Sequence, residues 1–246
     1  MDEQLYTIPV NDAFDSDCEC PLCVMHKALE TDAIDFTMGP SYMDDEVRMQ
    51  TNKTGFCAEH VRMLYAQRNR LGLGLMLHTH MQQVIRDVTS LQKKPVTGRS
   101  FFSKGKDPLT EYFEKLEASC FICDRINRMF SRYVETVFYL YRKDKAFRDK
   151  FASCKGFCSS HYALLREGSG KALSGKDRDE FVSVLDKLFL DNMNRVCDDV
   201  EWFTDKFDYR NADASWKNSK DALVRGILKL NSVFLDDQSE TLRGGL

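Results

Sequence analysis

Cysteine and histidine residues that can bind a metal ion occur in two matching sets. Each set is a Cys-x-x-Cys pair followed, at nearly the same spacing, by the segment Gly-Phe-Cys-x-x-His. The first set contains Cys20, Cys23, Cys57 and His60, and the second contains Cys120, Cys123, Cys158 and His161. Three thiolates and one imidazole are the ligands of a closed tetrahedral zinc site. We therefore predict two Cys3His sites that bind two zinc ions.

Two alternatives to zinc stay open from the sequence. Three cysteines and a histidine can also serve an iron–sulfur cluster, and the thiols can remain as a metal-free dithiol. Because each set already supplies four protein ligands, it leaves no coordination position for a substrate water, which argues against hydrolytic zinc chemistry. Structural metal binding contributes about 10–16 kcal/mol in isolated peptides, so the sites need no catalytic role.

Helices are expected to present these ligands. Residues three apart on a helix face the same way, so Cys57 and His60 can bind one ion together, as can Cys158 and His161. A helix N-terminus favours a nearby thiolate, because its free N–H groups and dipole stabilise negative charge. We expect each Cys-x-x-Cys to form its site with the Cys-x-x-His of the same repeat.

The residues beside each Cys-x-x-His are expected to support the site. The glycine allows a tight backbone turn before the ligand, and the phenylalanine packs beside the metal and keeps it dry. Three thiolates, a neutral imidazole and Zn²⁺ carry a net charge of −1, so a cation or N–H donors should lie nearby. Lys53 and Lys155 are the closest cations in the sequence.

Three cysteines and three histidines fall outside the sets, and of these histidines His26, three residues after the first Cys-x-x-Cys, is a fallback ligand only. Cys18 and Cys154 lie close to ligands and are either redox-responsive thiols that exchange with a ligand or incidental cysteines, the second interpretation being favoured. Cys197 is expected in the core, on the apolar side of a long helix. His78 and His80 are two residues apart, so on a helix they point in different directions and do not predict a third metal site.

Helical spacing of apolar residues predicts an all-α protein. The expected helices span about 21–36, 41–49 (with Ser41 as N-cap), 71–91, 109–118, 145–152, 176–207 and 215–232, with a long helix ending near 142. Gly168 and Gly170 are expected to end the helix that His161 opens. Residues 1–19 are expected to form an irregular acidic lead-in, with the backbone around Pro9 extended.

The doubled pattern predicts a helical bundle built from two pseudo-repeats. We expect a first repeat with its lead-in over 1–91, a basic linker over 92–107, and a second repeat with C-terminal helices over 108–246. The linker is interpreted as a solvated connector, with an anion-binding loop as the alternative. Because the net charge is −3 and the pI about 6.0, we consider nucleic acid an improbable partner.

The chain has no recognisable signal peptide and no apolar run of the roughly 20 residues that span a bilayer. Its nine cysteines would then be reduced thiols, which favours a cytoplasmic location.

Beyond the doubled pattern, several segments resemble one protein family. The chain is similar to members of an uncharacterised bacterial family, common in anaerobic Firmicutes, that carry CxxC…GFCxxH twice. The similar segments are 6–14, 39–43, 69–73, 77–80 and 206–210, with Trp216 soon after. The resemblance implies a bacterial cytosolic protein and carries no established activity. The segment 206–210 is either a partner-binding surface or, as we favour, a helix cap that docks Phe207 and Tyr209.

These observations favour a non-catalytic binding or adaptor module with a protein partner. The alternative is a redox-responsive or metal-handling protein, including an iron–sulfur enzyme, that uses Cys18 or Cys154 beside a metal centre.

Overall fold

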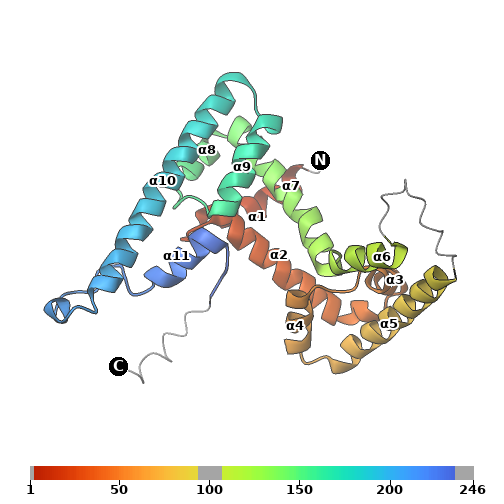
Figure 1. Ribbon diagram of the computed structural model, residues 1–246. Coiled ribbons are helices and arrows are strands. Elements are labelled where there is room, and N and C mark those ends of the chain that lie inside the picture. The colour runs from red at the N-terminus through yellow and green to blue at the C-terminus, as the bar shows by residue number, and fades with distance from the viewer. Residues whose placement is uncertain (1–2, 94–106, 236–246) are drawn as a thin grey trace, which may run out of the picture. The chain divides into compact units, whose positions relative to one another are not determined.

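The computed structural model describes residues 3–93 and 107–235, with side chains from residue 6 onward (Figure 1). It contains helices α1 (Glu3–Asp15), α2 (Pro21–Met38), α3 (Asp45–Thr54), α4 (Ala58–Ala66), α5 (Arg70–Gln92), α6 (Pro108–Glu117), α7 (Phe121–Lys143), α8 (Lys145–Ser153), α9 (Ser159–Ala172), α10 (Gly175–Asp205) and α11 (Ala222–Asn231), and 3-10 helices η1 (Pro40–Met43) and η2 (Tyr209–Asn211). These described ranges contain no strand, so the predicted all-α class is confirmed. None of the described helices is long and apolar enough to cross a membrane.

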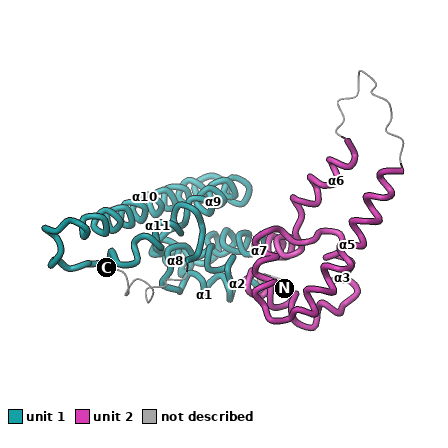
Figure 2. The backbone as a smooth tube through the Cα atoms, turned by 60° about the horizontal axis from the view of Figure 1, so that its bottom comes forward, with its two compact units in different colours: residues 1–27, 131–246 teal, residues 28–130 magenta. Residues whose placement is uncertain are grey.

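The chain forms two compact units (Figure 2). Unit 1 contains residues 1–27 and 131–246, and unit 2 contains residues 28–130. Helices α2 and α7 each begin in one unit and end in the other. The division into a first repeat, a linker and a second repeat stays a prediction, and most of the linker lies outside the described residues.

The core of unit 1 is largely aromatic. Phe14 of α1 lies 4.9 Å from Phe147 and 5.8 Å from Phe151 of α8, between ring centroids. Phe151 also contacts Phe157 of the second Gly-Phe-Cys segment, at 5.3 Å, and Phe181 of α10, at 5.0 Å. Such aromatic pairs bury large apolar areas and prefer edge or offset contacts. The phenylalanine next to Cys158 is therefore part of the core, as expected.

The core of unit 2 joins the inner faces of α2, α4, α5 and α7. Its buried residues are Ala33, Ile34, Met38, Leu64, Leu73, Met76, Cys120, Phe121, Ile122 and Ile126. Phe56 and Cys57 pack against this cluster. The first residues of α7 thus place a metal-binding segment directly in the core.

The expected irregular lead-in is wrong, because residues 3–15 form α1 with Pro9 inside the helix. Val10, Ala13 and Phe14 are buried at helical spacing. Proline disfavours an interior helical position through its missing N–H and its ring. The packing of this apolar stripe against α8 outweighs that local preference.

Two expected helix boundaries are also wrong. Asp44, and not Ser41, caps α3, since its carboxylate accepts hydrogen bonds from the backbone N–H groups of Glu46 and Val47. Helix α9 continues through its glycines to Ala172. A side chain on Gly168 would lie within 3.0 Å of the Phe138 ring, so this glycine serves helix packing instead of ending the helix.

Two expectations about surface residues are corrected in unit 1. Cys197 is exposed, because the neighbouring Val196 takes the inward position on α10. Lys206 does cap the end of α10, where its ammonium donates to the carbonyls of residues 211, 212 and 214. Tyr209, however, is 87% exposed, and Phe207 is 62% exposed although its ring lies 5.5 Å from that of Phe203, between centroids.

Candidate metal centres

The eight predicted ligands gather into two groups, each within one unit. Unit 1 brings together Cys20, Cys23, Cys158 and His161, and unit 2 brings together Cys57, His60, Cys120 and Cys123. In each group the four ligand atoms lie within 4.8 Å of one another. The expected pairing within a repeat is therefore wrong. Each Cys-x-x-Cys meets the Cys-x-x-His of the other repeat.

Four helix N-termini present the ligands in the same way. Cys57 and Cys158 are the N-cap residues of α4 and α9, and their carbonyls accept the first helical hydrogen bonds. Cys20 and Cys120 stand at the same place before α2 and α7. The second ligand of each pair follows three residues later. Each group thus combines two helix starts, whose N–H groups favour thiolates.

The two groups have nearly identical internal distances. In unit 1 the His161 Nδ1 atom lies 3.4, 3.3 and 3.2 Å from the sulfurs of Cys20, Cys23 and Cys158. In unit 2 the corresponding distances from His60 Nδ1 are 3.4, 3.3 and 3.2 Å to Cys120, Cys123 and Cys57. Sulfur atoms are separated by 3.5 Å in the Cys23–Cys158 pair and by 4.0 Å in the Cys57–Cys123 pair.

These distances fit the ligands of one metal ion and exclude disulfides. A disulfide joins its sulfurs at about 2.05 Å, and every cysteine of the chain is free. Three sulfurs and one imidazole nitrogen at such separations can coordinate one metal ion.

In unit 2 backbone contacts connect the two ligand-bearing segments. The Phe121 N–H donates to the Gly55 carbonyl at 3.0 Å, and the Ser119 hydroxyl donates to the Thr54 carbonyl at 2.7 Å. Gly55 has a φ of +59°, and a side chain there would meet the His80 ring at 2.7 Å. Only glycine fits this turn, as the sequence predicts. The His80 ring in turn donates a hydrogen bond from Nδ1 to the Asn52 carbonyl, at 2.8 Å.

In unit 1 a buried lysine makes the equivalent connection. Pro21 stands where Phe121 stands in the other repeat and has no N–H to donate. Instead, the Lys229 ammonium of α11 donates to the carbonyl of Glu19, at 2.7 Å, and to that of Lys155. Lys229 therefore links the two segments that carry the ligands through hydrogen bonds to both.

The same lysine supplies the positive charge near the unit 1 centre. Lys229 is 1% exposed, and its ammonium lies 3.2 Å from the buried Glu19 carboxylate, which also pairs with Arg195 at 2.6 Å. Of the two cations expected from the sequence, Lys155 pairs with Asp17 through its ammonium, and Lys53 is exposed in unit 2. Sequence reasoning missed Lys229, although a single lysine within the apolar run of residues 226–230 is a signal of such a buried charge.

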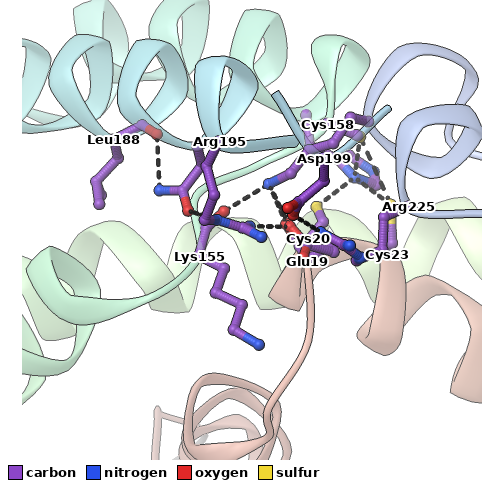
Figure 3. A network of polar contacts seen from close by, with 12 residues as sticks. Glu19, Cys20, Cys23, Lys155, Cys158, Leu188, Arg195, Asp199 and Arg225 are labelled. Carbon is purple, nitrogen blue, oxygen red and sulfur yellow. Dashed lines mark hydrogen bonds and ion pairs between the residues drawn. The ribbon is translucent and has the colours of Figure 1, made fainter. Parts of the chain in front are cut away.

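Figure 3 shows this network beside the ligands of unit 1, with Glu19 and Cys20 drawn between Arg195 and Arg225. A further donor is Ser232, whose hydroxyl donates to the Cys158 sulfur at 3.0 Å. Donors of this kind reduce the negative charge on thiolate ligands.

The unit 2 centre is supported by a carboxylate. The Glu30 carboxylate lies 3.4 Å from Nε2 of His60, while Nδ1 faces the three sulfurs. A carboxylate behind a ligating imidazole fixes which nitrogen faces the metal. The hydrogen bond with Cys120 raises the pKa of His60, and the charge of Glu30 adds to this effect.

In each of the two groups, the pKa values of the cysteines are shifted in opposite directions. Burial raises the pKa of Cys20 and of Cys123 to about 12. Hydrogen bonds from the neighbouring thiols lower the pKa of Cys158. Burial opposes ionisation of Cys120, but hydrogen bonds with His60 and backbone N–H groups lower its pKa to about 6. In each group, hydrogen bonds from neighbouring groups thus lower the pKa of one cysteine, Cys158 or Cys120, and a divalent cation would favour the ionised form of its thiol ligands.

The remaining candidates lie outside both ligand groups. Burial raises the pKa of Cys18 and, to about 11, that of Cys154, so neither is an activated thiolate. Among the described residues, His78 and His80 belong to neither of the groups of metal-binding side chains.

No curated protein and no solved structure matches the chain. The model of a family of unknown function, DUF6062, matches residues 1–237, nearly the whole chain. The resemblance seen in the sequence is thereby confirmed, and the chain belongs to the DUF6062 family.

Proposed function

We propose that the protein is a zinc-binding protein with two structural Cys3His sites and a non-catalytic binding or adaptor role. The observation that carries this proposal is the geometry of the two ligand groups. A tetrahedral zinc ion with Zn–S bonds of about 2.3 Å and a Zn–N bond of about 2.1 Å separates sulfur from nitrogen by about 3.6 Å and sulfur from sulfur by about 3.8 Å. The distances of 3.2–3.4 Å and 3.5–4.0 Å in both units are close to these values.

A single ion fits these groups better than an iron–sulfur cluster does. A cluster distributes its protein ligands over two or more iron atoms, so the ligand atoms lie farther apart than around one ion. Four atoms within 4.8 Å of one another form one coordination shell. The closed shell also supports the non-catalytic role, because no position is open to substrate water.

The nine free thiols support a reducing compartment, and we propose a cytoplasmic location in a bacterial cell on the resemblance to the bacterial family. The adaptor role implies a protein partner.

Elemental analysis of the purified full chain tests the proposal. We expect two zinc ions per chain, a colourless protein, and visible bands of tetrahedral sulfur coordination after cobalt replaces zinc. Iron and acid-labile sulfide in a brown protein would contradict the zinc assignment. A folded protein that carries no metal and takes none up would contradict the metal sites altogether.

A further inference from the structure

A pocket of about 450 Å³ lies in unit 1, beside the metal centre. Its walls come from α10, α11, the loop before α11, and the segments that precede α2 and follow α8. Sites for small molecules typically have volumes of about 300–1,000 Å³ and apolar walls. The described residues that line this pocket are all charged or amide side chains. The pocket is therefore suited to a charged ligand and not to an apolar one.

Positive charge predominates around the pocket. Its cations are Lys155, Arg195, Lys217, Lys220 and Arg225. Its carboxylates are Glu19, Asp199 and Asp221, and all three are already paired. Arg225 contacts both aspartates at 2.8 Å, and Glu19 is held by Arg195 and Lys229. Figure 3 shows Glu19, Arg195, Asp199 and Arg225 in one network.

Donors remain for a ligand after these pairs are made. The Lys220 ammonium is exposed and contacts no acceptor in the described part of the chain. Arg195 uses Nε for Asn192 and Nη2 for Glu19, which leaves Nη1 without an acceptor among the described residues. The Lys217 ammonium lies 3.8 Å from the centroid of the Trp202 ring, and its backbone has a φ of +49°, an uncommon conformation for a residue with a side chain.

We propose that this pocket binds a small multivalent oxyanion, of the class of a phosphorylated metabolite. Arginine and lysine donors that converge in a concave site favour phosphate oxygens, because charge-assisted hydrogen bonds are the strongest available there. A concave site lined by an excess of one charge also concentrates ligands of the opposite charge. The whole chain carries a net charge of −3, so this local positive excess distinguishes the pocket from the rest of the chain as a place for an anion to bind.

Calorimetric titration of the metal-loaded full chain with inorganic pyrophosphate tests this proposal. We expect saturable binding, and at least about tenfold weaker binding by the double variant Lys217→Gln/Lys220→Gln, which removes two exposed cations. The matched control is Lys143→Gln/Lys176→Gln, which removes two exposed lysines of the same unit outside the pocket. The control should bind pyrophosphate as the wild type does.

Three outcomes would overturn the proposal. These are no binding by the wild type at millimolar pyrophosphate, equal weakening in the two double variants, and tighter binding of a short single-stranded oligonucleotide than of pyrophosphate at the same salt concentration. The last outcome would indicate a polyanion surface instead of a small-molecule pocket. Metal analysis of both double variants should still give the wild-type content, which separates this proposal from the metal sites.

Discussion

Lys229 is the residue whose burial and charge distinguish the metal centre of unit 1. Its ammonium is enclosed, donates to two backbone carbonyls and faces the buried Glu19 carboxylate. Burial lowers the pKa of Lys229, whereas the charge of Glu19 opposes that shift. In unit 2 the corresponding connection uses uncharged donors, the Phe121 N–H and the Ser119 hydroxyl. The two centres therefore have the same types of ligand but different surroundings.

Replacing this lysine should destabilise the protein strongly. We expect Lys229→Met to lower the free energy of unfolding by about 3 kcal/mol, because it leaves two carbonyls without a donor and the Glu19 carboxylate with one partner fewer. Denaturant unfolding in zinc-containing buffer measures this change. The double variant Glu19→Gln/Lys229→Met should recover part of the loss, since it also removes the buried carboxylate.

A matched control is Lys150→Met in the same unit. Lys150 pairs with Asp15 at 2.6 Å at a partly exposed site, where such pairs contribute about 0–1 kcal/mol. If Lys229→Met lowers the free energy of unfolding by no more than this control does, Lys229 does not link the two ligand-bearing segments as described.

At the scale of single residues, the sequence predicts the ligands but not their supports. Spacing identifies the Cys-x-x-Cys and Cys-x-x-His segments because both ligands of a pair must lie on one helical turn. Proximity in sequence points to Lys53 and Lys155 as nearby cations, whereas the structure uses Lys229, which is distant in sequence. Long-range contacts of this kind leave no periodic pattern.

Helix lengths explain why the segments pair across the repeats. Helix α2 has 18 residues and α3 has 10, so at about 1.5 Å per residue α2 is about 27 Å long and α3 about 15 Å. For α7 and α8, with 23 and 9 residues, the lengths are about 35 and 14 Å. Neither short helix spans the distance back to its own Cys-x-x-Cys. The helix ranges expected from the sequence already show this difference in length, and it argues against pairing within a repeat.

Helix α1 shows how packing overrides a local signal. Its apolar residues give only a weak helical pattern in the sequence, and Pro9 favours an extended backbone there. Phe14→Ala should lower the free energy of unfolding by about 3–5 kcal/mol, because the ring contacts three phenylalanines in the core.

Thermal or denaturant unfolding of Phe14→Ala and of Ile8→Ala checks this expectation. Ile8 lies on the same helix but is 67% exposed, so its substitution should change the free energy of unfolding by no more than about 0.5 kcal/mol. Equal effects of the two substitutions would mean that α1 does not pack as described.

At the scale of the whole molecule, each candidate metal centre brings together segments that are far apart in the chain. The unit 1 centre connects residues 20–23 with 158–161, and the unit 2 centre connects residues 57–60 with 120–123. In sequence, all of unit 2 (residues 28–130) falls between the two segments that the unit 1 centre connects. The all-α class followed from sequence periodicity, but the two units did not, because they depend on which distant segments meet.

The metal content of two double variants tests this cross-pairing most directly. Cys20→Ser/Cys158→Ser removes two ligands from the unit 1 centre only, so the full chain should retain one zinc ion against a chelator of moderate strength. Cys20→Ser/Cys57→Ser removes one ligand from each centre and should retain none. If the first variant holds no zinc while the second holds one ion, the sites form within each repeat and the described arrangement is wrong.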